Sequence, residues 1–283
     1  MPPKQGRSEN KPGFSDAPER IVPGSPDWVA AYPDHIQRYE FAMRLIKPGS
    51  KVLDAGCGVG YGAAYMADHG AGQIVAVDIS NEALQIAQNN FARDAIKWVQ
   101  DDCHTLQKVE EFAPFDAVCN LENIEHLAEP EKFLGRLTRL LAPAGVSIVS
   151  TPNRILMNKL RGEEPGAASK NRFHYREYTS EEFVGLLRKF FDEVRLAYQR
   201  PTAVTRATLA LHPFLNSIWT NPAMRFGRLI QRTLRRPDIP RELNEMLPPR
   251  EWELLDQDPG ALETWTFIAV CSRAKRSAPC ASS

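Results

Sequence analysis

One glycine-rich segment, residues 51–62 with the sequence KVLDAGCGVGYG, constrains the fold of this chain most strongly. Its first residues fit the end of a buried strand, whereas residues 63–67 are compatible with a helix. Between them, Asp54 precedes glycines at every second position from Gly56 to Gly62. Glycine is required where a ligand approaches bare backbone or where φ takes values closed to residues with a Cβ. The segment therefore predicts a strand, a tight turn and a helix, the arrangement that opens a ligand site in open α/β sheets.

The spacing of these glycines separates two classes of ligand. A dinucleotide site has the pattern G-x-G-x-x-G, but the sixth residue is Tyr61 when counting starts at Gly56, and Ala63 when it starts at Gly58. The observed pattern, Asp-x-Gly-x-Gly-x-Gly, resembles motif I of the class I S-adenosylmethionine (SAM)-dependent methyltransferases. An acid before the glycines suits a ligand that carries an ammonium and a sulfonium rather than a pyrophosphate. The resemblance implies SAM as cofactor, bound by Asp54, Gly56, Cys57, Gly58 and Gly60.

Acidic residues after the next two predicted strands extend this resemblance. Asp78 ends the second strand, where a carboxylate can accept two hydrogen bonds from ribose hydroxyls. Its neighbour Ile79 is assigned to the same site. The third strand is followed by Asp101, Asp102 and Cys103. In the family, an acid at this point binds the adenine amino group and the next backbone N–H meets a ring nitrogen. Asp102 with Cys103 fits that register best, and Asp101 is the alternative.

Two more cofactor contacts are predicted from the same resemblance. Residues 34–46 show apolar side chains three and four residues apart, which indicates a helix. In related folds an arginine on this helix pairs with the SAM carboxylate, and Arg38 is the candidate; a solvated surface arginine is the other interpretation. Asn120, at the end of the predicted strand 115–120, is assigned to the cofactor site as well.

The segment after that strand contains residues that could perform or assist catalysis. On a helical turn, Glu122, Glu125 and His126 would share one face, and two carboxylates with an imidazole suit a divalent metal ion. The Glu-x-x-Glu-His pattern is similar to that of small-RNA 3′-terminal 2′-O-methyltransferases and some ubiquinone-pathway O-methyltransferases. In the former a later histidine completes the site, and His174 stands where it would be expected. The alternative is a site without metal, in which Glu125 caps or braces the loop and His174 only precedes a helix. In that site His126 either acts as the catalytic base or only shapes the pocket.

The overall pattern predicts an α/β fold with a Rossmann-like seven-stranded sheet flanked by helices. The resemblance supplies the strand order 3-2-1-4-5-7-6, with strand seven antiparallel. We expect a helical insertion at 200–260 between strands six and seven. Within it, residues 223–236 are predicted to form a helix with one apolar face and several arginines. That helix could be a lid over the acceptor, a helix packed on the domain, or a peripheral membrane contact.

Length and composition set the remaining expectations. The chain has 283 residues, which we divide into a disordered tail at 1–20 and a single domain at 21–283. The first 20 residues lack the apolar core of a signal peptide, and no run reaches the ~20 apolar residues of a membrane span. The five cysteines form no C-x-x-C pair, which favours a cytoplasmic protein.

These observations predict an enzyme that transfers methyl groups from SAM to an oxygen of a small molecule or glycan. Two alternatives stay open: a metal-assisted RNA 2′-O-methyltransferase, and a non-catalytic methyltransferase-like binding protein. The formal net charge is zero, and this argues against a nucleic-acid partner. No feature of the sequence specifies an oligomeric state.

Overall fold

The structure, a computed structural model, describes residues 23, 26–164, 166–168, 171, 173–207 and 251–275. The tail expected at 1–20 and the helix expected at 223–236 lie outside these residues. The structure describes two ends of the expected insertion, since one strand continues through Pro201 and another begins at Trp252.

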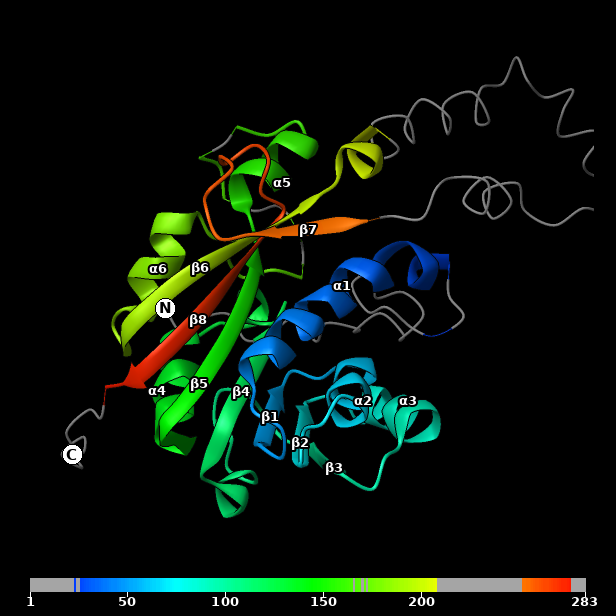
Figure 1. Cartoon of the computed structure of the whole chain (residues 1–283). Helices are drawn as coiled ribbons and strands as arrows, with labels where there is room; N and C mark the ends of the chain where they lie inside the picture. The colour runs from blue at the N-terminus through cyan, green and yellow to red at the C-terminus, as the bar shows by residue number, and fades with distance from the viewer. Residues whose placement is uncertain are drawn as a thin grey trace, which may run out of the picture.

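Strands and helices alternate along the first half of the chain (Figure 1). The elements in order are α1 (Pro26–Leu45), β1 (Lys51–Ala55), α2 (Tyr61–Asp68), β2 (Gln73–Asp78), α3 (Asn81–Phe91), β3 (Ile96–Gln100), η2 (Glu110–Phe112), β4 (Phe115–Leu121), η3 (Ile124–His126), α4 (Pro130–Leu140), β5 (Leu141–Pro152), α5 (Arg154–Leu160), α6 (Ser180–Leu187), β6 (Phe191–Pro201), β7 (Trp252–Leu255) and β8 (Thr266–Ala274).

The strands form one sheet in the order β3-β2-β1-β4-β5-β8-β6-β7. Strands β1 to β5 run parallel to one another, whereas β8 runs antiparallel between β5 and β6. The α/β class, the order of the first seven positions and the antiparallel strand are confirmed, with β8 as the strand predicted to be seventh. The predicted number of strands is one too low, because β7 pairs antiparallel with the end of β6. An ion pair of 2.7 Å between Arg200 and Glu253 joins these two strands.

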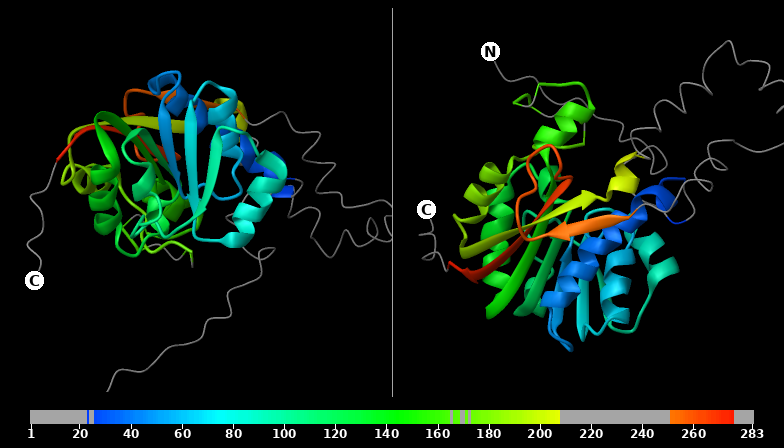
Figure 2. Two further views of the ribbon diagram at one scale, coloured as in Figure 1. Left: turned by 90° about the horizontal axis from the view of Figure 1, so that it is seen from below. Right: turned by 45° about the horizontal axis from the view of Figure 1, so that its top comes forward.

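Helices cover both faces of the sheet, as the two views in Figure 2 show. Successive residues of β1 illustrate the two layers: Val52 belongs to the cluster that contains Ala42 of α1 and Met66 of α2, whereas Leu53 belongs to the cluster that contains Phe133 of α4 and Phe183 of α6. Side chains buried on both faces explain why the parallel strands read as continuous apolar runs. Because β1 is parallel to both β2 and β4, the carboxyl ends of these three strands lie at the same edge of the sheet. Ligands bind at that edge in sheets of this kind.

Helix α6 begins with a capping box. Thr179 and Glu182 form this capping box, in which each side chain accepts a hydrogen bond from the other residue's backbone N–H.

Within the part of the chain that the structure describes, no helix is both long and apolar enough to cross a membrane.

Candidate active site

The glycine loop between β1 and α2 exposes backbone at one position in particular. Gly56, Gly58 and Gly60 have φ values of 81°, 55° and 88°, which favour glycine. A Cβ at Gly56 would lie 2.5 Å from the Asn123 side chain, and one at Gly60 would lie 2.6 Å from Ala87. A Cβ at Gly58 would have no protein atom within 4 Å. Gly56 and Gly60 are therefore required by packing, whereas the surface of Gly58 is available to a ligand.

Two buried oxygen atoms near this loop have no hydrogen-bond donor among the described residues. They are Oδ2 of Asp54, at the end of β1, and Oδ1 of Asn120, at the end of β4. The remaining polar atoms hold the side chains in place, since Tyr39 donates to Asp54 Oδ1 at 3.3 Å and Asn120 Nδ2 donates to the Ala55 carbonyl at 2.9 Å. A buried acceptor without a donor costs about 1–3 kcal/mol. An ammonium group of a ligand would remove that cost, so both residues fit the amino end of SAM.

The environment of Asp54 makes its charge state dependent on such a ligand. Burial raises the pKa of Asp54 to about 7; the Tyr39 hydrogen bond opposes this, and the charge of Asp78 adds to it. A cation beside the carboxylate would favour the ionised form.

Asp78 holds the glycine loop against the end of β2. Its Oδ2 accepts a hydrogen bond from the Gly58 N–H at 2.9 Å, and its Oδ1 accepts from the Ser80 N–H at 2.8 Å. The next side chain, Ile79, is 60% exposed. The Asp78 carboxylate thus lies beside Gly58, where it suits a ribose.

The structure distinguishes between the two acids that follow β3. Asp101 is buried, and its carboxylate accepts from the backbone N–H groups of Asp102 and Lys108 at 2.8 and 2.7 Å. Asp102 is partly exposed and accepts from His104. Partial burial raises the pKa of Asp102, but the hydrogen bonds from His104 outweigh burial and hold this pKa below its ordinary value. Asp101 has a structural role in the turn, so Asp102 and the adjoining Cys103 remain the predicted adenine contacts.

Arg38 is buried rather than solvated, with 1% of its surface exposed. Its Nη2 donates to Asp34 Oδ2 at 2.9 Å, its Nε donates to Gln199 Oε1 at 2.8 Å, and Glu122 Oε2 lies 3.8 Å from Nη2. Nη1 is buried and has no hydrogen-bond partner in the described part of the chain. The surface interpretation of Arg38 is wrong, because β6 and β8 supply polar partners for it, including Thr266. Its contact with the SAM carboxylate remains a prediction.

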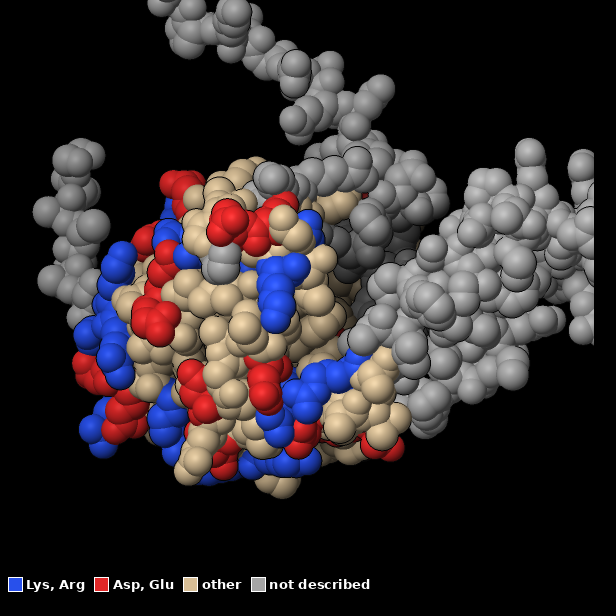
Figure 3. All heavy atoms as spheres, turned by 90° about the horizontal axis from the view of Figure 1, so that it is seen from above, with Lys and Arg blue, Asp and Glu red and all other residues tan. Residues whose placement is uncertain are grey.

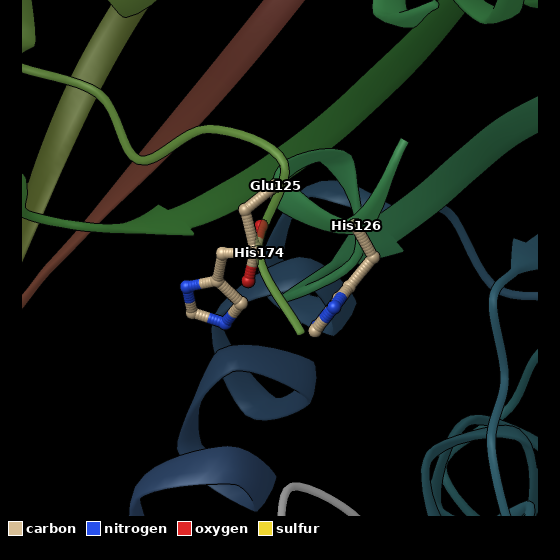
Figure 4. Close-up of side chains that lie close together, drawn as sticks. All are labelled: Glu125, His126 and His174. Carbon is tan, nitrogen blue, oxygen red and sulfur yellow. The ribbon is translucent and has the colours of Figure 1, made fainter. Parts of the chain in front are cut away.

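Three of the four predicted metal ligands lie together. Glu125, His126 and His174 each offer a ligand atom, and these atoms lie within 4.8 Å of one another. In Figure 4 the side chains of Glu125, His126 and His174 gather in one place. Glu122 is outside this group, because it has a φ of 52° and precedes the short helix η3. The Ser150 hydroxyl donates to its carboxylate at 2.8 Å.

Hydrogen bonds determine which nitrogen of each histidine carries the proton. His126 Nδ1 lies 3.0 Å from the Phe173 carbonyl oxygen, and His174 Nδ1 lies 2.8 Å from Glu177 Oε1. A carbonyl or carboxylate oxygen only accepts, so both Nδ1 atoms must donate. In the neutral rings, Nε2 then holds the lone pair. The rings meet edge to face with centroids 4.8 Å apart.

The carboxyl group of Glu125 is buried within this cluster. The Thr151 hydroxyl donates to it at 3.1 Å. Burial, and secondly the nearby charge of Glu122, raise the pKa of Glu125 well above its ordinary value. A divalent cation among the three residues would stabilise the ionised form, so the donor set fits a metal ion of intermediate hardness.

Sequence reasoning did not identify Glu177 or Arg161 as parts of this site. Glu177 is buried and binds the Arg161 guanidinium through both carboxylate oxygens, at 3.0 and 2.6 Å. Burial would raise its pKa, but hydrogen bonds from His174 and Arg161 outweigh burial and lower the pKa of Glu177 to about 2. The position of Glu177, three residues after His174 and just before a capping box, was the available signal.

Comparisons with known proteins agree with this geometry. The family model described as a methyltransferase domain matches residues 53–149. A probable S-adenosylmethionine-dependent methyltransferase of Mycobacterium tuberculosis is 31% identical over 197 residues, covering 65% of this chain and 66% of the relative. A ubiquinone biosynthesis O-methyltransferase of Xanthomonas campestris is 36% identical over 118 residues, covering 40% of this chain and 47% of the relative.

A solved structure shows the same fold over most of the chain. The SAM-dependent methyltransferase of Thermotoga maritima superposes with a TM-score of 0.53 and 16% identity, covering 87% of this chain and 93% of that one. The glycine loop, the sheet order and these relatives lead to one assignment. The chain belongs to the class I SAM-dependent methyltransferases.

Proposed function

We propose that this protein transfers the methyl group of SAM to an oxygen atom of a small molecule or glycan. One observation supports this most directly: the His126 ring is fixed by the Phe173 carbonyl so that Nε2 holds the lone pair. The adjoining Asn123 packs against Gly56, which places the loop of His126 next to the glycine loop. A base is therefore held beside the site expected for the methyl donor.

The donor site needs to position SAM rather than activate it, because the sulfonium already activates the methyl group. We propose that Asp54 and Asn120 bind the ammonium of SAM, Asp78 binds the ribose, and Asp102 binds the adenine. These contacts would align sulfur, methyl and acceptor oxygen for an in-line displacement. His126 Nε2 would take the proton that the acceptor hydroxyl loses, which is general-base catalysis.

The comparisons support an oxygen acceptor through the ubiquinone biosynthesis O-methyltransferases, which match part of the chain. On the face shown in Figure 3, Lys and Arg side chains are interspersed with Asp and Glu rather than gathered in one block. This face therefore agrees with a small or uncharged acceptor. We also propose a reducing, cytoplasmic setting, because the cysteines at 57, 103, 119 and 271 are buried and free.

A metal-assisted form of the reaction is the second candidate, supported by the cluster of Glu125, His126 and His174. When bound, a divalent ion would lower the pKa of an acceptor hydroxyl. The two mechanisms exclude each other at His126, because one Nε2 lone pair cannot both bind a metal ion and accept the proton. The metal form would suit an acceptor with two neighbouring hydroxyl groups.

The test is mass spectrometry of products formed with trideuteriomethyl SAM from a library of phenols, catechols and glycans. We expect a product that carries one labelled methyl group on oxygen. His126→Gln should reduce turnover by about 100-fold or more, whereas His69→Gln, at the exposed C-cap of α2, should leave it unchanged. Turnover that survives a chelator eliminates the metal form, and a product methylated only on nitrogen or carbon contradicts the proposal.

A further inference from the structure

The buried carboxylate of Glu177 joins the end of α5 to the segment that carries His174. Arg161, at the end of α5, donates through both terminal nitrogens, at 3.0 and 2.6 Å. His174 donates Nδ1–H to the same carboxylate at 2.8 Å. The guanidinium is itself held by Asn158, whose Oδ1 accepts from Nη2 at 2.7 Å. The side chain of Glu177 is 0% exposed, and that of His174 is 9% exposed.

This arrangement specifies the orientation of the His174 ring. A buried carboxylate is tolerated when paired and hydrogen-bonded, and the bidentate Arg161 contact meets that need. Because Arg161 occupies both oxygens from one side, Glu177 has a fixed direction in which to accept the imidazole N–H. Nδ1–H therefore points toward Glu177, and the opposite nitrogen, Nε2, points away from it. His174 contributes a ligand atom within 4.8 Å of those of Glu125 and His126.

The backbone of the same segment is attached to the active-site loop. The Tyr175 N–H donates to the Glu125 carbonyl at 2.8 Å, and the Phe173 carbonyl accepts from His126. The segment thus positions His126 through its backbone and His174 through Glu177. A carboxylate behind a histidine is also the usual way to fix its tautomer at a functional site.

We propose that Glu177, held by Arg161, is a positioning residue that keeps His174 in the Nδ1–H form with Nε2 directed toward Glu125 and His126. The inference rests on the proposed function, because it assigns Nε2 of His174 to the acceptor side of that site. Glu177 itself contacts neither donor nor acceptor, and it acts through His174.

The experiment is long-range ¹H–¹⁵N NMR of the histidine rings in the full chain. It compares wild type, Glu177→Gln, and Glu182→Gln as the matched control. Glu182, in the first turn of α6, pairs with Arg154 at 2.8 Å, so its substitution removes the same charge next to an arginine. His174 is assigned by the signal lost in His174→Gln. Turnover with the acceptor found in the library screen is measured in parallel.

We expect the Nδ1–H form of His174 in wild type and in Glu182→Gln. Glu177→Gln should lose this form and lower kcat by about 10- to 100-fold, with little change in the KM for SAM. A wild-type His174 that carries its proton on Nε2 overturns the inference, even where Glu177→Gln fails to fold. Unchanged tautomer and kcat in Glu177→Gln also overturn it. Absence of methyl transfer in wild type contradicts the proposed function instead, and the tautomer still decides the inference.

Discussion

Replacing Gly58 by alanine separates ligand contact from backbone strain. A Cβ at Gly58 would have no protein atom within 4 Å, so the free protein has room for it. The φ of 55° is unfavourable for alanine and costs about 1–2 kcal/mol. We therefore expect Gly58→Ala to fold, with a modest loss of unfolding free energy.

The loss of SAM affinity in Gly58→Ala should be larger than strain explains. The methyl group would occupy the space in which we place the donor, and it would separate the donor from the Gly58 backbone. Displacing a well-packed ligand from one such contact should weaken binding by at least about 1.4 kcal/mol, or tenfold. Isothermal titration calorimetry with SAM measures the affinity, and urea unfolding measures the stability.

Gly49→Ala is the matched control for this experiment. Gly49 has a φ of 78° and also has no atom within 4 Å of an added Cβ, but it lies before β1 and outside the site. It should lose similar stability and bind SAM normally. If Gly58→Ala binds SAM as tightly as Gly49→Ala, the donor does not lie over this loop.

Three further predictions test other parts of the site. Asp54 has a pKa of about 7 through burial and must be ionised to bind an ammonium, so SAM affinity should rise with pH between about 5.5 and 7; Asp54→Asn should remove this slope in calorimetry, and a flat wild-type profile would contradict the assignment. Asp78→Ala should weaken SAM binding by about tenfold or more, because charge-assisted hydrogen bonds contribute about 1.5–3 kcal/mol; equal affinity in the variant would remove Asp78 from the ribose site. Gly62→Ala should destabilise the fold by about 1–3 kcal/mol in urea unfolding, because its Cβ would lie 1.9 Å from the Tyr39 ring; a loss below about 0.5 kcal/mol would mean that α1 and α2 pack differently.

The features that the sequence predicts correctly are local ones. The strand that ends at Asp78 and the glycine turn after β1 depend on neighbouring residues, and their positions follow from apolar runs and glycine spacing. The order of the strands in the sheet does not follow from the pattern of apolar residues. It was predicted from the resemblance to a family. Strand β7 was missed because its four residues are stabilised by the far end of β6 rather than by their own alternation.

The structure of the site differs from the sequence predictions mainly where segments far apart in the chain contact one another. Arg38 is buried because Gln199 and Thr266 arrive from the other end of the sheet. Glu122 leaves the shared face expected of a helical turn because its backbone adopts a positive φ before η3 begins. Glu177 gains its role from Arg161, a contact that depends on the path of the intervening chain.

A crystal structure with S-adenosylhomocysteine, the demethylated form of SAM, tests the central claim most directly. The account predicts the ribose hydroxyls at the Asp78 carboxylate, the amino group near Asp54 and Asn120, and the sulfur on the side of His126. A ligand bound away from the carboxyl ends of β1 and β2, or Gly58 covered by protein side chains, would contradict it.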